Sequence, residues 1–202
     1  ITHVGIEEFD QAIRDYSKSI QINANFFEAY NKRGEVYRNL SDYGKAIEDY
    51  SIAIQINPKY AEAFFNRGYA YAAIKQYDNA IENYNHAIAI DNHLANAYYN
   101  RAIVYIDKKS YAKALLDLDQ AIQYNSNFWQ AYHSRAMLYA DLKSYANALN
   151  DYTISIRINP ENRRAYNNRG VLYLLKEDYD SAITDFSEVV KLNPDDIAAY
   201  EN

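Results

Sequence analysis

Apolar and small residues recur along the chain with helical spacing, in pairs of stripes. Phe64, Gly68 and Tyr71 fall at i, i+4 and i+7, which places them on one face of a helix. A second stripe over residues 77–88 repeats that spacing, and a short polar break at residues 75–76 separates the two. The pattern predicts two helices joined by a tight turn, so that they fold back on each other as an antiparallel hairpin.

This hairpin pattern repeats along the whole chain with a period of 34 residues. A sustained period of this size is typical of a solenoid, in which each unit packs only on its neighbours. We predict a single array over residues 1–202. It has full units at 27–60, 61–94, 95–128, 129–162 and 163–196, and partial units at 1–26 and 197–202.

Five positions of the 34-residue unit carry the same kinds of residue throughout. Position 20 is alanine every time, position 8 is glycine or alanine, and positions 4, 11 and 24 are almost always aromatic. In the unit 61–94 these residues are Phe64, Gly68, Tyr71, Ala80 and Tyr84. The set resembles the tetratricopeptide repeat family. The resemblance implies an all-α, right-handed superhelical solenoid of antiparallel hairpins, with the first helix of each unit lining a concave groove.

The chain departs from the family pattern at two positions. Position 7, leucine in the family, is arginine here, and the closing proline at position 32 is present only as Pro58, Pro160 and Pro194. The packing positions are intact, so we expect the hairpins to form. We expect small residues at positions 8 and 20 to let the paired helices approach closely. Most tyrosines at positions 4, 11, 17 and 24 should lie in the core, and Asp or Ser at position 16 should cap the second helix.

The arginines at position 7 lie beside the core stripe and therefore need partners. Aspartate recurs at position 23, with Asn83 as the exception. We predict structural pairs between consecutive units, with Arg101 opposite Asn83: Asp15–Arg33, Asp49–Arg67, Asp117–Arg135 and Asp151–Arg169. Pairing inside one unit, such as Asp49 with Arg33, is the alternative. A structural role is favoured over ligand binding because the helical phase turns these residues to the core.

The face of each first helix opposite its packing stripe is the predicted peptide-binding surface, because the family resemblance places this helix in the groove. Asparagine recurs there at position 6, and its amide can both donate to and accept from a peptide backbone. This row resembles the asparagine ladder of O-linked N-acetylglucosamine transferase and kinesin light chain. Lys32 and Ser134 interrupt it, which favours a short site over residues 61–128. The alternative is that asparagine is simply frequent in this chain. The candidates are Lys32, Phe65, Asn66, Tyr69, Tyr99, Asn100, Ile103, His133 and Asn168.

The family's carboxylate clamp for chaperone C-termini is absent. It requires lysine at position 5 and asparagine at position 9 ahead of the next unit's asparagine, where this chain has Asn31 and Glu35. Binding of chaperone C-termini is therefore not expected.

Composition excludes several other functions. The net charge is −6 with no basic run, which argues against nucleic acid. There is no cysteine, and a turn separates His86 from His93, so no metal or cofactor is expected. No glycine-rich phosphate loop or nucleophile elbow is present. No apolar run has the length of a membrane span. A soluble protein follows, with the cytoplasm the favoured compartment, although composition does not fix it.

The sequence thus predicts a non-catalytic module that binds a peptide or protein segment in its groove. A self-assembling scaffold is one alternative: residues 197–200 start a further helix with no polar cap, so the terminal faces could stack end to end into a homo-oligomer. A regulatory or targeting domain of a larger enzyme is the other.

Overall fold

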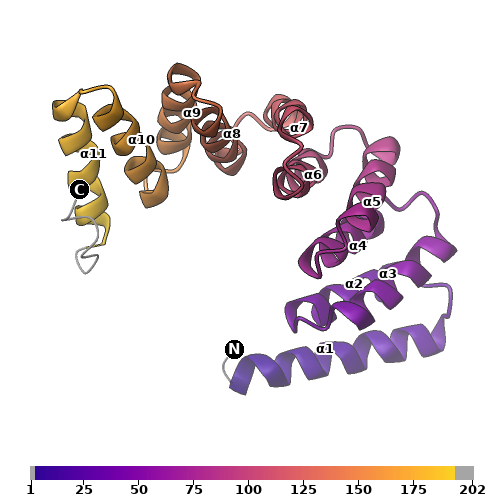
Figure 1. The fold of residues 1–202 in the computed structure, drawn as a ribbon. Coiled ribbons are helices and arrows are strands. Elements are labelled where there is room, and N and C mark those ends of the chain that lie inside the picture. The colour runs from indigo at the N-terminus through magenta and orange to yellow at the C-terminus, as the bar shows by residue number, and fades with distance from the viewer. Residues whose placement is uncertain (1–2, 194–202) are drawn as a thin grey trace. The chain divides into compact units, whose positions relative to one another are not determined.

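The computed structural model describes residues 3–193, and within that range the chain forms α-helices and no strand (Figure 1). The all-α prediction is confirmed. The further unit predicted at 197–202 lies outside the described residues. The helices are α1 (His3–Ile22), α2 (Phe27–Asn39), α3 (Tyr43–Ile56), α4 (Ala61–Ala73), α5 (Tyr77–Ile90), α6 (Ala95–Asp107), α7 (Tyr111–Tyr124), α8 (Trp129–Asp141), α9 (Tyr145–Ile158), α10 (Arg163–Leu175) and α11 (Tyr179–Leu192).

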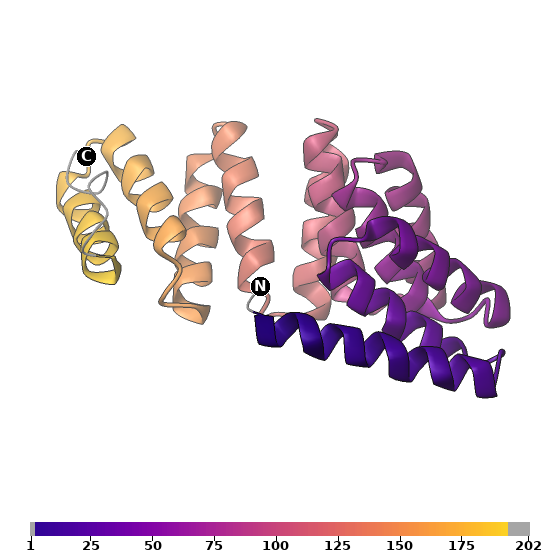
Figure 2. The ribbon, with the colours of Figure 1, turned by 90° about the horizontal axis from the view of Figure 1, so that it is seen from below.

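Helix boundaries follow the 34-residue period. The first helix of each full unit begins at position 1, and the second begins at position 17. By its contacts the chain divides into two compact units, residues 1–110 and 111–202. In the first unit α2 pairs with α3 and α4 with α5, while α1 packs on α2 and α6 on α5 (Figure 2). In the second unit α8 pairs with α9 and α10 with α11, and α7 packs on α8.

Small residues bring the two helices of a hairpin into close contact, as predicted. The alanines at position 20 that lie in α3, α5, α7, α9 and α11 are fully buried. At position 8 a Cβ added to Gly34 would lie 2.7 Å from the Tyr50 ring, and one added to Gly68 would lie 2.9 Å from the Tyr84 ring. The aromatic ring at position 24 therefore occupies the space that a larger residue at position 8 would need.

The prediction that most tyrosines are core residues is only partly correct. Tyr50, Tyr84 and Tyr152 at position 24 are buried. The tyrosines at positions 11 and 17 are half-buried at best, and Tyr179 is 59% exposed. A stack of hairpins is only two helices thick, so rings on its flanks pack one face and keep the hydroxyl in water.

The turn within each hairpin uses a left-handed residue at position 15. Ser41, Lys75, Lys109, Lys143 and Glu177 all have φ between 57° and 61°. None is glycine, although L-residues pay about 1–2 kcal/mol for this conformation. The left-handed turn was not predicted from the sequence, because no glycine marks it.

The turn between hairpins is closed by the side chain at position 31 of the unit, which accepts a hydrogen bond from the backbone N–H two residues later. The accepting oxygens belong to Asn57, Asp91, Asn125 and Asn159, at 3.0–3.2 Å. Such Asx turns explain part of the asparagine content of the chain.

Helix capping at position 16 agrees with the prediction in part. The Asp42 carboxylate accepts from the Lys45 N–H and that of Asp178 from the Ser181 N–H. Ser144 makes no cap, because its hydroxyl accepts instead from the Asn147 side chain at 3.1 Å.

None of the described helices combines the length and the apolar content that a membrane span needs.

Candidate functional site

The arginines at position 7 pair inside their own hairpin. The Arg33 guanidinium donates to Asp49 through Nε at 2.8 Å and Nη2 at 2.7 Å. Arg135 binds Asp151 and Arg169 binds Asp185 with the same two-pronged geometry. The predicted pairs Asp15–Arg33, Asp49–Arg67, Asp117–Arg135 and Asp151–Arg169 are therefore wrong, and the alternative inside the unit is correct. The reason is that positions 7 and 23 face each other across the hairpin contact.

Arg67 differs because its partner is neutral. Its Nε donates to the Asn83 side-chain oxygen at 2.8 Å, so the predicted placement of Arg101 opposite Asn83 is also wrong. Burial without a carboxylate partner lowers the pKa of Arg67, whereas the hydrogen bond to Asp49 raises the pKa of Arg33.

Each of these arginines also reaches back to the preceding hairpin. The remaining Nη1 group donates to a side chain at position 25 of the unit before, sixteen residues earlier. The acceptors are Ser17, Ser51, Asn85, Asp119 and Thr153. We call this two-sided contact the arginine clasp. It joins three helices, so these arginines serve the stack rather than a ligand.

The asparagine row does not form one continuous surface. Asn66 is only 4% exposed, and its amide donates to Asn31 at 3.1 Å and to Glu35 at 3.3 Å. Lys32 forms ion pairs with Glu35 at 2.9 Å and Glu62 at 3.2 Å. These two candidates belong to a polar network between α2 and α4.

Arg38, at position 12 of its unit, closes the space beside Asn66. Its Nη1 donates to the side-chain oxygen Oδ1 of Asn66 at 3.2 Å, and its guanidinium lies 5.3 Å from the centre of the Tyr69 ring. Where position 12 is alanine, in Ala72 and Ala140, the equivalent space is open.

The open space beside Ala72 is a cavity of about 210 Å³ between α4 and α6, which we call pocket A. It includes three of the predicted groove residues, Tyr69, Asn100 and Ile103. Its lining consists of Tyr69, Ala72, Ala73, Tyr84, Asn100, Ile103, Val104 and Asp107.

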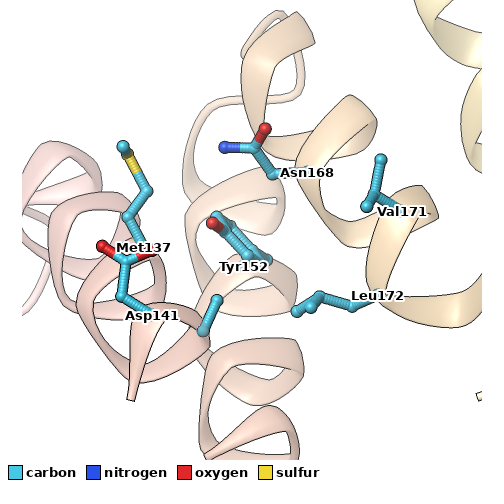
Figure 3. A pocket seen from close by; sticks show the side chains of 7 residues that line it. Met137, Asp141, Tyr152, Asn168, Val171 and Leu172 are labelled. Carbon is cyan, nitrogen blue, oxygen red and sulfur yellow. The ribbon is translucent and has the colours of Figure 1, made fainter. Parts of the chain in front are cut away.

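The open space beside Ala140 is the equivalent cavity in the second unit, about 260 Å³ between α8 and α10, which we call pocket B (Figure 3). It includes the predicted groove residue Asn168. Its lining consists of Met137, Ala140, Asp141, Tyr152, Asn168, Val171 and Leu172. Both pockets therefore combine aliphatic walls with a tyrosine at position 24, one asparagine and one aspartate, and pocket A has Tyr69 as a second tyrosine.

The tyrosine at position 24 brings a buried hydroxyl to each pocket. The Tyr84 hydroxyl has no hydrogen-bond partner within the described chain, and burial raises its pKa well above the usual value. Burial also raises the pKa of Tyr152, to about 12, although a hydrogen bond from the Asn168 side chain acts in the opposite direction. In Figure 3 the Tyr152 hydroxyl and the Asn168 amide point toward the same space.

The other groove candidates lie in or beside the core. Phe65, a candidate of the predicted peptide-binding surface, is half-buried against Tyr84, with ring centres 6.1 Å apart. His133 packs edge-on against Tyr152 at 5.5 Å, and its Nδ1 lies 3.4 Å from the Asn162 amide. Tyr99 is half-buried.

Sequence reasoning missed the residues that open the pockets. Alanine at position 12 was unremarkable in an alanine-rich chain, and the tyrosine at position 24 was assigned to the core alone. The signal was available in the alternation of large residues and alanine at position 12, which is Arg38, Ala72, Ile106, Ala140 and Leu174 in successive units. Among the described residues no group of three potential metal ligands comes together.

Comparisons with known proteins agree with this architecture. Family models described as TPR repeat match residues 6–41 and 34–75, and models described as tetratricopeptide repeat match 61–94, 95–128, 130–162 and 164–196. A search of curated protein sequences found no significant match.

Several solved structures share the fold. YrrB, described as a TPR protein with an unusual peptide-binding site, superposes with a TM-score of 0.73 at 21% identity over 92% of this chain and 96% of that one. A MamA protein gives 0.73 at 26% identity over 87% and 96%. PilF of Pseudomonas aeruginosa gives 0.85 at 19% identity over 98% and 90%.

The repeated helical hairpins define a protein-interaction module of the helical-repeat class. The chain belongs to the tetratricopeptide repeat family.

Proposed function

We propose that this module is non-catalytic and binds an extended segment of a partner protein, one of whose side chains enters pocket A or pocket B. The observation that carries the proposal is the recurrence of one pocket at one register in both compact units. Each pocket lies between consecutive first helices and presents asparagine from position 6 beside tyrosine from position 24.

The size of the pockets favours a single side chain as the occupant. Their volumes of about 210 and 260 Å³ are below the range of about 300–1,000 Å³ that is common for small-molecule and cofactor sites. Apolar walls with a few polar groups suit one anchoring side chain of a longer segment.

The asparagines can hold the backbone of such a segment. The Asn100 amide donates to the Asn96 carbonyl oxygen at 2.8 Å, which leaves its own carbonyl oxygen to accept from a peptide N–H. The unpartnered Tyr84 hydroxyl beside it supports the same interpretation, because a buried hydroxyl without a partner costs about 1–3 kcal/mol that a ligand can relieve.

The test is selection from a random peptide display library on the whole chain, followed by affinity measurements with pocket-filling variants. Ala72→Leu fills pocket A and Ala140→Leu fills pocket B without changing charge or helix propensity. Ala146→Leu, at an exposed position of α9 outside both linings, is the matched control. Selected peptides should bind the control normally and at least one pocket-filled variant much more weakly. Binding that neither pocket-filling variant changes would overturn the proposal.

A second candidate function rests on the exposed face of the last hairpin. Leu175 and Ile183 are each 63% exposed and lie beside the exposed Tyr179. This face is a candidate for stacking against a second copy of the chain. Sedimentation at rising concentration should then show association that Ile183→Glu abolishes. A monomer at every concentration would exclude end-to-end assembly of this chain.

A further inference from the structure

We infer that pocket B accepts a cationic side chain, lysine or arginine, with Asp141 as its counter-ion. This inference rests on the peptide-binding function proposed above and specifies the chemistry of the partner at one of its two pockets.

Asp141 is an exposed carboxylate at the end of α8, on the edge of pocket B. It has no hydrogen-bond or ion-pair partner within the described residues, whereas Asp49, Asp151 and Asp185 at position 23 are buried in the arginine clasps. A carboxylate at the mouth of an apolar pocket attracts a cation whose stem can enter the pocket.

The interior of pocket B suits the methylene chain of such a residue. Met137, Val171 and Leu172 form the walls, and the flexible thioether of Met137 can adapt to stems of different shape. The Tyr152 hydroxyl, which points into this space, adds an acceptor for an ammonium or guanidinium group (Figure 3).

No cationic residue lines pocket B. Arg164, at position 2 of its unit, lies on the same face of α10 as Asn168, one helical turn earlier. Asp141 is at position 13, so the two charges are about 16 Å apart along the direction of the first helices. Lys143 and Lys176 lie in the turns that follow α8 and α10, and neither pairs with Asp141 within the described structure. The Asp141 end of the pocket therefore carries an uncompensated negative charge.

Pocket A provides an internal comparison. Its aspartate, Asp107, lies in α6, and the residue of pocket A at the position of Asp141 is Ala73. Because pocket A has no carboxylate at that position, it should not favour a cation at that point as pocket B does.

The experiment uses pools of synthetic peptides with random flanks around one central residue, fixed as lysine, arginine, norleucine or glutamate. Binding of each pool to the whole chain is measured by fluorescence anisotropy, for the parent and for Asp141→Asn, Asp141→Lys and Ala140→Leu. Asp180→Asn, an exposed aspartate of α11 outside the lining, is the matched control for the loss of one charge.

We expect the lysine and arginine pools to bind about ten-fold more tightly than the norleucine pool, as one charged hydrogen-bonded contact provides. Asp141→Asn should remove this advantage, Asp141→Lys should shift the preference to glutamate, and Asp180→Asn should leave it unchanged.

Two other outcomes separate this inference from the function on which it rests. If norleucine binds as tightly as lysine and Ala140→Leu weakens both, the cation preference is wrong and the peptide site stands. If Ala140→Leu changes the binding of no pool, pocket B is not a binding site and both conclusions fail for it.

Discussion

The Arg33 guanidinium and the Asp49 carboxylate meet across the contact between α2 and α3 through two parallel hydrogen bonds of 2.8 and 2.7 Å. The carboxylate side chain is only 5% exposed, so removal of the arginine would leave a buried charge without its counter-ion. The energetic consequence should depend on whether the partner at position 23 is charged.

Arg33→Met is therefore expected to destabilise the chain more than Arg67→Met. The first variant leaves the buried Asp49 unpaired, which costs about 3–5 kcal/mol. The second leaves the neutral Asn83, for a cost of about 1–3 kcal/mol. Both arginines also lie over an aromatic ring at position 4, at 5.7 and 5.6 Å, so this contribution is matched. Urea unfolding of the two variants measures the difference, and equal losses would show that the charge of the partner does not matter.

Gly68→Ala should destabilise the first unit by about 1–3 kcal/mol, as overpacking of a core does. The added Cβ would lie 2.9 Å from the Tyr84 ring, which is itself fully buried. Gly44→Ala is the control, because its Cβ meets only the Asp42 carboxylate at 3.8 Å on an exposed helix surface. That variant should instead stabilise by about 0.5–1 kcal/mol through the lower backbone entropy of the unfolded chain. Thermal unfolding of both proteins provides the readout, and a neutral or stabilising Gly68→Ala would contradict the close approach of α4 to Tyr84.

Lys75→Gly should stabilise the hairpin of α4 and α5 by up to about 1 kcal/mol. Lys75 has φ of 60°, which glycine adopts without the penalty of about 1–2 kcal/mol that an L-residue carries. The larger entropy of glycine in the unfolded chain offsets part of the gain. Lys75→Ala removes the same side chain and keeps the strain, so it should lie near the parent in the unfolding midpoint. If glycine and alanine gave the same midpoint, the left-handed turn would not limit stability.

The second unit should lose stability as the pH falls below about 6.5, the ordinary pKa of histidine. Burial, with a smaller contribution from Arg164, lowers the pKa of His133 in the folded chain. The unfolded chain therefore binds a proton at a higher pH than the folded chain does, and unfolding becomes easier as the pH falls through that window. His133→Asn should flatten this dependence between pH 7.5 and the folded-state pKa. Unfolding midpoints of the parent and the variant across that range test it, and parallel curves would exclude His133 as the cause.

Removing one hydroxyl should have opposite effects at the two pockets. Tyr84→Phe deletes an unpartnered buried hydroxyl and should stabilise the free protein by about 1 kcal/mol. Tyr152→Phe deletes the partner of Asn168 and should cost about 0.5–1.5 kcal/mol. Denaturant unfolding compares the two, and a loss on Tyr84→Phe would indicate that this hydroxyl is hydrogen-bonded in solution.

The period of the sequence was sufficient to predict the hairpins, because helix starts and core alanines such as Ala80 depend on local spacing alone. It was not sufficient to assign the partner of Arg33. Position 7 can contact position 23 either within one hairpin or between two consecutive hairpins. Which contact forms depends on the angle at which the helices cross. The pockets depend on one side chain in the same way: Arg38 closes the space that Ala72 leaves open, and only the three-dimensional packing shows that position 12 points there.

The arginine clasp makes the units of this chain interchangeable. The clasps of Arg33, Arg67, Arg135 and Arg169 each reach sixteen residues forward within the hairpin and sixteen residues back to the hairpin before, so these contacts do not depend on which unit the arginine occupies. If residues 61–94 were excised, Arg101 would face Ser51 in place of Asn85, another acceptor of the kind that position 25 always supplies. Insertion or removal of one 34-residue unit therefore preserves the arginine contacts between consecutive units. Each inserted or removed unit could add or remove a pocket.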